Sequence, residues 1–256
     1  TLKSVYDRFE ETHRFSALDC TWKEGDPNVP HVFWDSDIAK WLEGLAYSLS
    51  FYKNDELEKI ADESIEKIIK NSDENGYYNS HFLVMGERFT DRSEHELYCA
   101  GHLMEAAVAY YNATGKRTLL DAMCKYADYI EKVFVKDKSA AFVTPGHPEI
   151  ELALVKLYEV TGEKRYLELS KFFIDNHGAN EIDKNLYRGC NGDYNQDDRP
   201  LRERETADGH CVRALYLFCG MADIAYLYND KELFEAAERL FMNIVNKRMY
   251  ITGATG

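Results

Sequence analysis

The chain has 256 residues, of which 45% are hydrophobic, and it carries a formal net charge of -14 at pH 7. This length and apolar content are sufficient for the core of a globular protein. The negative charge argues against nucleic acid as a partner, because phosphate binding requires clustered Lys and Arg. The apolar runs are short and broken by charges, so no membrane span is predicted.

Six cysteines are scattered along the chain, several of them at apolar helical positions where a thiol acts as a small hydrophobic group. They are Cys20, Cys99, Cys124, Cys190, Cys211 and Cys219. No Cys-x-x-Cys pair occurs, so a zinc site built within this chain alone is not expected. The scattered thiols favour a reducing, cytoplasmic setting, and a leader preceding the first residue would not be seen.

Four amphipathic helical hairpins are predicted along the chain. Hydrophobic residues at helical spacing over 36–52 are followed by the polar turn KNDE and by a second apolar stripe that begins at Leu57. The same design returns over 94–135 around the turn TGKR, and over 147–178 around TGEK. A fourth copy, around NDKE, ends near residue 247.

Residues 1–14 are predicted to hold one helix of a further hairpin, so four to five hairpins are expected. The two Thr-Gly turns, at Thr114 and Thr161, are 47 residues apart, a spacing typical of helical arrays. Strand-like patterns are short, and the clearest cover residues 140–145 and 249–253. The predicted fold class is therefore all-α.

Long connections precede two of the predicted inner helices, from Asn71 to Ser93 and from Gly178 to Thr206. They are rich in Asn, Asp, Arg and Tyr, which is typical of loops that surround a pocket. A closed toroid of helical hairpins, the α/α barrel, would bring such loops to one face. Because closing that toroid takes six hairpins, we expect residues 1–256 to form a partial α/α barrel.

Histidines recur at equivalent places in the predicted hairpins. His102, His147 and His210 each follow a glycine, in or just before the first helix of a hairpin. His95 precedes His102 by seven residues, so both are expected on one helix face. An imidazole both donates and accepts at neutral pH, which suits a sugar hydroxyl. These four histidines are predicted to bind sugar hydroxyls; the alternative is that they cap helices or fill the core.

The stretch FWDSD, residues 33–37, has two interpretations. Ser36 or Asp37 is predicted to cap the helix that follows. Trp34 and Asp35 are predicted to stand just outside that helix and to line a pocket, because an aromatic face and a carboxylate suit a sugar ring.

Five long segments of the chain, in order, resemble one known family. They are HVFWDSDIAKWLEGLAYSL, SEHELYCAGHLMEAAVAYYNATGKRTLLDAMCKYADYI, GHPEIELALVKLYEVTGEKRYLELSKFFID, ADGHCVRALYLFCGMADIA and RMYITGATG. Together they resemble glycoside hydrolase family 127, the β-L-arabinofuranosidase family, over nearly the whole chain. The resemblance implies a six-hairpin α/α barrel as the catalytic domain, with residues 1–256 as part of it. It also implies β-sandwich domains that follow the barrel and are not present in this chain.

The resemblance further implies a retaining hydrolysis of terminal β-L-arabinofuranosyl units. In this family the nucleophile is a cysteine that belongs to a zinc site of one glutamate and three cysteines, and another glutamate is the acid/base. These motifs are expected beyond Gly256, and none of the cysteines in this chain matches them. The chain alone is therefore expected to be inactive, and to supply the sugar-binding half of the barrel for an arabinose-containing glycan. The residues expected to bind the sugar are His95, His102, His147, His210, Trp34 and Asp35.

Two other functions fit the residues. A sugar epimerase with an α/α barrel would use two histidines as acid and base, and would release no glycoside product. A non-catalytic helical-repeat binding protein would use its outer faces, so replacing the histidines would cost it no ligand. The sequence leaves the oligomeric state open.

Overall fold

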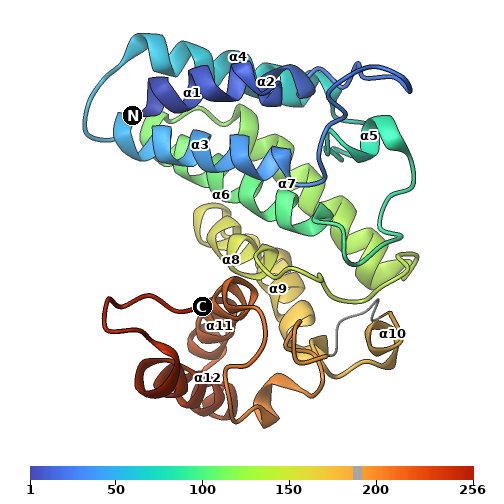
Figure 1. The fold of residues 1–256 in the computed structure, drawn as a ribbon, viewed down its shortest axis with the longest axis vertical. Helices are drawn as coiled ribbons and strands as arrows, with labels where there is room; N and C mark the ends of the chain where they lie inside the picture. Colours follow the sequence, from blue (N-terminus) through green and yellow to red (C-terminus); the bar gives the residue numbers. More distant parts are fainter. Residues whose placement is uncertain (187–191) are drawn as a thin grey trace. The chain divides into compact units, whose positions relative to one another are not determined.

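The computed structural model describes residues 1–186 and 192–256, and over these residues the chain forms helices, turns and a single isolated β-bridge (Figure 1). The described chain divides into two compact units. The first comprises Thr1–Arg88 and Glu94–Ser139, and the second comprises Phe89–Ser93 and Ala140–Gly256. Cys190 lies outside the described residues.

The first unit contains two helical hairpins and three short or peripheral helices. Its elements are α1 (Leu2–Glu11), α2 (Arg14–Ala17), α3 (Trp34–Leu49), α4 (Asp55–Asn71), α5 (Phe82–Met85), α6 (Glu96–Thr114), α7 (Thr118–Glu131) and the π-helical turn η1 (Lys132–Lys136). Helices α3 and α6 lie side by side in Figure 1 and share the most extensive contact between elements of this unit. The apolar stripe of α3, Ile38, Leu42 and Leu45, is fully buried. Burial of this stripe stabilises the pairing of the two helices.

The second unit contains two further hairpins. Its elements are α8 (Ile150–Thr161), α9 (Lys164–Asn176), α10 (Glu181–Lys184), the 3-10 turn η2 (Leu201–Glu203), α11 (Cys211–Leu227), α12 (Lys231–Asn243) and the π-helical turn η3 (Ile244–Arg248). Helix α8 packs on α9 and α11, and α11 packs on α12. Their common core includes Val155, Ile174, Leu217 and Leu240.

The two Thr-Gly turns close equivalent hairpins by the same hydrogen bonds. Thr114 and Thr161 each donate a hydroxyl hydrogen bond of 2.7 Å to the carbonyl four residues earlier. The glycines that follow, Gly115 and Gly162, both have φ near 75°, a left-handed C-cap that glycine adopts without steric cost. The repeat predicted from the two Thr-Gly turns is therefore structural: α6 and α8 end in the same kind of turn.

The prediction of four hairpins is confirmed, and α1 provides the helix expected within residues 1–14. The predicted all-α class is confirmed, and neither strand-like pattern forms a strand within the described residues. In the segment 140–145, the amides of Val143 and Thr144 donate to the carboxylate of Asp183 instead of to a neighbouring strand. In the segment 249–253, pairing is limited to one antiparallel bridge between Met249 and Thr255. None of the helices within the described parts of the chain combines the length and hydropathy that a membrane crossing requires.

Candidate functional site

Helix α3 begins at Trp34, with Phe33 as its N-cap and no side-chain cap. The prediction that Ser36 or Asp37 caps this helix is wrong, as is the placement of the Trp-Asp pair outside it. The Ser36 hydroxyl instead donates to the carbonyl of Phe33 at 2.8 Å. Acidic side chains in this first turn complement the helix dipole, which favours the earlier start.

Trp34 is half-buried and faces a cation. The guanidinium of Arg14 lies 5.4 Å from the centre of the Trp34 ring. The Nε of Arg14 also donates to Asp37 Oδ2 at 2.8 Å, so the guanidinium is held in place. Trp34 therefore ties the start of α3 to α2; its predicted contact with a sugar stays a prediction.

Asp35 is 2% exposed and lies against the loop that precedes α5. Its Oδ2 accepts a hydrogen bond of 2.7 Å from the backbone amide of Ser80. Burial raises the pKa of Asp35, and the hydrogen bonds from Ser80 oppose part of that rise. Asp35 thus holds the loop on α3, and a contact with a sugar remains a prediction for this residue too.

Two of the predicted histidines lie along α6 with a tyrosine between them. His95 is the N-cap of α6 and His102 lies within the helix. The ring of Tyr98 packs edge-on against both, with centroid distances of 5.5 Å to His95 and 4.5 Å to His102. The ring of Phe33 also packs edge-on against His95, with a centroid distance of 5.5 Å. Tyr98 was not predicted as a site residue, although its spacing of three and four residues from the two histidines places it on their face of the helix.

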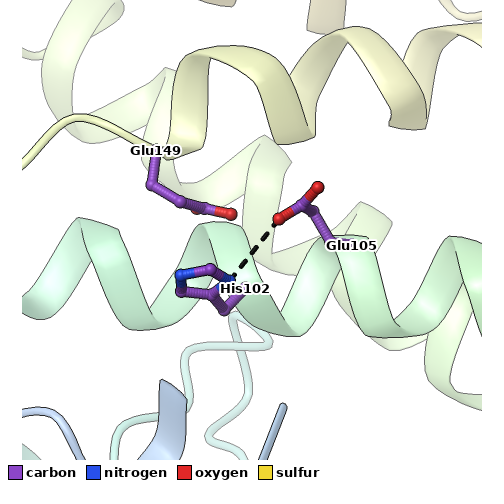
Figure 2. A group of neighbouring side chains, drawn as sticks. All are labelled: His102, Glu105 and Glu149. Atoms are coloured by element: carbon purple, nitrogen blue, oxygen red, sulfur yellow. Dashed lines mark ion pairs between the residues drawn. The ribbon is translucent and has the colours of Figure 1, made fainter. Parts of the chain in front are cut away.

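His102 also pairs with a glutamate one turn further along α6. Figure 2 shows the Nδ1 of His102 and the Oε2 of Glu105, which are 3.5 Å apart, joined by a dashed line. Both side chains are buried, at 2% and 6% exposed. A buried carboxylate beside an imidazole fixes the orientation of the ring. Glu105 is a second residue of this helix face that the sequence analysis missed.

His147 and His210 lie together in the second unit, 5.8 Å apart between ring centres. The Nδ1 of His147 is 2.9 Å from the carbonyl of Pro148, and because a carbonyl only accepts, this nitrogen carries a hydrogen. The Nδ1 of His210 accepts from the amide of Arg213 at 3.4 Å, so its hydrogen lies on Nε2. Partial burial and the nearby Arg213 lower the pKa of His210, which keeps the ring neutral. In their neutral forms the two rings present opposite groups at Nε2, an acceptor on His147 and a donor on His210.

The glycine before each of these histidines allows a close backbone approach. A Cβ on Gly146 would lie 2.2 Å from the carbonyl oxygen of Arg92. Gly209 has φ 83°, and a Cβ there would lie 1.9 Å from the carbonyl oxygen of Asp193. Neither position has room for a side chain, so these glycines set the path of the chain into His147 and His210.

Aromatic rings flank the histidine pair. The ring of Tyr194 lies 5.5 Å from His210, and the ring of Tyr216 lies 6.1 Å from His147. The guanidinium of Arg213 stacks on Tyr194 at 4.8 Å. Neither tyrosine was predicted as a site residue. Tyr194 comes from the loop before α11, and no periodic pattern predicts which loop residue reaches a helix start.

Two carboxyl groups are fully buried at the start of α8. Glu149 precedes the helix as its N-cap, and it is the third side chain drawn in Figure 2. The backbone amide of Glu149 donates to Glu151 Oε2 at 2.9 Å. Burial raises the pKa of Glu151 to about 7, although hydrogen bonds from backbone amides and the charge of Arg92 oppose the rise. Glu151 can therefore hold or release a proton near neutral pH.

A buried arginine supports the segment that leads to His147. The Nε of Arg92 donates to the carbonyl of Thr144 at 2.8 Å, and its Nη2 donates to the Thr144 hydroxyl at 3.0 Å. Arg92 also forms ion pairs with Asp197 and Asp183, both of which are buried. This network fixes the backbone just before the glycine at 146, and therefore the position of the imidazole that follows it.

The zinc site implied by the family resemblance does not fit the described cysteines. A protein zinc site holds its ligand atoms close together around the ion. Over residues 1–186 and 192–256, no group of three or more His, Cys, Asp or Glu ligand atoms lying within 4.8 Å of one another includes a cysteine. Burial raises the pKa of the Cys99 thiol well above its usual value, and it raises that of Cys20 to about 12. No step of the chemistry is assigned to these thiols.

Comparison with known proteins identifies the fold and the family. Residues 3–256 match the GH127 catalytic domain of β-L-arabinofuranosidases. A non-reducing end β-L-arabinofuranosidase of Bifidobacterium longum subsp. longum is 39% identical over 245 residues, which cover 88% of this chain and 37% of that protein.

Two solved structures are also similar. A GH127 β-L-arabinofuranosidase from Geobacillus stearothermophilus T6 superposes with a TM-score of 0.88 at 44% identity, and covers 96% of this chain. A GH127 β-arabinofuranosidase superposes with a TM-score of 0.89 at 34% identity and covers the whole of it. This chain spans 41% of each of those two chains.

The helical hairpins and these neighbours place the chain among the glycoside hydrolases with an α/α-barrel fold. Within that class, the chain belongs to glycoside hydrolase family 127, the β-L-arabinofuranosidase family. It spans about a third of the length of the curated relative, 37%.

Proposed function

We propose that a protein containing this chain hydrolyses terminal β-L-arabinofuranosyl units of glycans, and that residues 1–256 supply the sugar-binding part of its α/α-barrel catalytic domain. The family match supports the reaction class. The β-sandwich domains of the family are not part of this segment. The partner is an arabinose-containing glycan.

The observation that carries the proposal is the pairing of His147 with His210. One ring presents an acceptor and the other a donor, 5.8 Å apart between centres. A sugar hydroxyl donates one hydrogen bond and accepts another, so two such rings can hold one hydroxyl or two neighbouring ones. Tyr194 and Tyr216 add aromatic edges beside the pair, which suits the C–H groups of a sugar ring.

The roles of the remaining predicted residues follow from their contacts. His95 and His102, with Tyr98 between them, form a second polar and aromatic face on α6 that suits sugar hydroxyls. Trp34 and Asp35 hold α2 and the loop before α5 on the start of α3. Each of these groups binds or orients, and the bond-breaking groups of the family are the acid/base glutamate and the cysteine.

Zinc is the cofactor that the family resemblance implies, and in this family it holds the nucleophilic cysteine as a thiolate. The described cysteines of this chain do not fit that role, so the zinc ligands of the family lie outside the described residues of this segment. A cytoplasmic setting is supported by the free thiols of Cys20, Cys99 and Cys211.

The test uses two proteins: residues 1–256, and a polypeptide that continues this sequence to the length of the curated relative. In the longer protein, His147→Ala and His210→Ala should each lower kcat/KM on an aryl β-L-arabinofuranoside by about tenfold or more, the effect of removing one good hydrogen bond. Tyr52→Ala is the control, because that side chain is 77% exposed on the turn after α3.

Full activity in the double variant His147→Ala/His210→Ala would rule out the assigned sugar contacts. Interconversion of free sugars without release of any glycoside product would instead support the epimerase hypothesis.

A further inference from the structure

The first unit contains a cavity that no predicted sugar-binding residue lines. Its volume is about 190 Å³, and it lies between the corner that joins α1 to α2 and the loop that leads toward α3. The lining side chains that matter here are His13, Ser16, Thr21, Trp22, Asp26 and Asn28. The proposed hydrolysis uses none of them.

The loop that forms one wall is held by its own hydrogen bonds. The indole N–H of Trp22 donates to the carbonyl of Asp26 at 3.1 Å, and the amide of Lys23 donates to the Asp26 carboxylate at 3.0 Å. At the far end of the loop, the Nδ1 of His81 lies 2.7 Å from the carbonyl of Pro30 and donates to it. The wall is therefore built before any ligand arrives, which reduces the entropy lost on binding.

Two of the lining residues adopt a backbone conformation that is uncommon outside glycine. His13 has φ 65° and Asn28 has φ 59°, both in the left-handed region. Such residues persist only where the surrounding structure holds them, and they cluster at ligand sites. They lie at the two sides of the cavity, one before α2 and the other in the loop.

The chemistry of the lining selects the class of ligand. It combines an indole ring with two hydroxyls, a carboxamide, a carboxylate and an imidazole, and none of the described lining residues is Lys or Arg. Phosphate and other anions are disfavoured by this composition, whereas a neutral polyhydroxyl ring finds both hydrogen-bonding groups and an aromatic partner. The volume corresponds to about six water molecules, which is enough for one sugar ring.

We propose that this cavity is a second carbohydrate site of the first unit, which binds one neutral sugar residue of the glycan through Trp22. The choice of a sugar from the same glycan rests on the proposed function, but the cavity, its lining and its position do not. The site would hold the substrate glycan at a point in addition to the sugar that is hydrolysed, and would raise the local concentration of that glycan.

The experiment titrates L-arabinose into the ¹⁵N-labelled 256-residue chain and follows its three tryptophan indole N–H signals by NMR. The Trp22 signal is identified by its loss in Trp22→Phe. It should shift on titration and yield a dissociation constant. In Trp22→Ala, binding followed by arabinose saturation transfer should weaken about tenfold at this site, the upper effect of one aromatic contact.

Two further variants keep the test independent of folding. His13→Asn removes the imidazole while retaining a residue that tolerates the left-handed backbone, and should also weaken the Trp22 response. Phe51→Ala removes an 81% exposed aromatic ring of the same unit that does not line the cavity, and should leave the response unchanged.

The outcome is separable from that of the proposed function. If the Trp22 signal shifts equally in wild type and in His147→Ala/His210→Ala, the cavity binds sugar whether or not the histidine pair does. A Trp22 signal that stays constant up to saturating L-arabinose overturns the second site, even if hydrolysis by the longer protein proceeds as proposed.

Discussion

At the scale of single residues, two buried groups of the second unit titrate in opposite senses. Burial raises the pKa of Glu151 to about 7 and lowers that of His177 to about 4. The Nε2 of His177 donates to the carbonyl of Asn195 at 2.9 Å, and this hydrogen bond opposes part of the lowering that burial causes. Both groups are neutral near pH 6 in the folded chain, which places no unpaired charge in the core.

Glu151→Gln tests the buried carboxyl. The ordinary pKa of 4.5 applies to the unfolded chain and about 7 to the folded chain, so the folded state binds the extra proton between these values. The free energy of unfolding therefore falls as pH rises from about 4.5 to 7. Relative to wild type, the variant should gain up to roughly 3 kcal/mol between pH 5 and pH 8, measured by urea denaturation at each pH.

The matched control for this prediction is Glu163→Gln, in the exposed turn between α8 and α9. Its difference from wild type should stay constant over the same pH range. A constant difference for Glu151→Gln as well would mean that Glu151 is ionised in the folded chain. The His177 contribution is present in all three proteins and cancels in the comparison.

The sequence predicted the residue types of the candidate site better than their contacts. The glycine-histidine pairs identified His147 and His210, because each glycine fills a position where no Cβ fits. Tyr194 and the buried state of Asp35 could not be predicted, since both depend on loops that meet a helix distant in sequence. Asp35 was expected beside a pocket, whereas its carboxylate accepts from a buried loop amide.

At the scale of elements, hydrophobic periodicity was sufficient to predict the hairpins. The exact ends of the helices depend on contacts with other parts of the chain. The apolar stripes predicted all four hairpins because each buries one face against a neighbour. The start of α3 was misplaced since the first turn carries no cap of its own. The segment 140–145 has strand-like residues, but its amides bind a carboxylate that comes some 40 residues later, at Asp183.

Two helical glycines, Gly220 and Gly44, differ in how much space a Cβ atom would have, and this difference predicts opposite effects of alanine substitution. A Cβ at Gly220 in α11 would lie 2.9 Å from the Cβ of Glu151 in α8, whereas the nearest atom to one at Gly44 in α3 is 4.0 Å away. Gly220→Ala should therefore destabilise the chain by about 1–3 kcal/mol through overpacking.

Gly44→Ala is its control and should stabilise the chain by about 0.5–1 kcal/mol, because alanine is the better helix former. Thermal or urea denaturation of the two variants provides the comparison. Equal effects of the two substitutions would show that α11 does not approach α8 closely at Gly220.

At the scale of the whole molecule, the boundary between the two units is crossed more than once along the chain. The five-residue segment Phe89–Ser93 belongs to the second unit, yet residues of the first unit flank it on both sides. Arg92 is the polar anchor of this segment, with its guanidinium buried against Asp197 and Asp183. Hydrophobic periodicity in the sequence could not predict that this segment belongs to the second unit, because its placement depends on an ion pair between residues that are distant in sequence.

Arg92→Met should destabilise the second unit by about 3–5 kcal/mol, since it leaves two carboxylates buried without their cation. Hydrogen exchange measured by mass spectrometry should accelerate in α8 and α9 and stay unchanged in α3. Arg88→Met is the control: Arg88 pairs with Asp73 in the first unit, where both side chains are partly exposed, so the loss should be about 1 kcal/mol or less. Faster exchange in α3 for Arg92→Met would contradict the assignment of this segment.

The anchoring of Arg92 also constrains the order of events on the ribosome. Asp197 lies 105 residues after Arg92, so at typical rates of synthesis it emerges roughly 5 to 20 s later. Helices α3 to α7 are synthesised well before then, at a time when the carboxylates that pair with Arg92 are still absent. Because a charged guanidinium is stable when it is hydrated, the segment can remain a solvent-exposed loop until the carboxylates are synthesised. Nascent chains that stop short of Asp197 should therefore expose this loop to proteases, and finished chains should protect it.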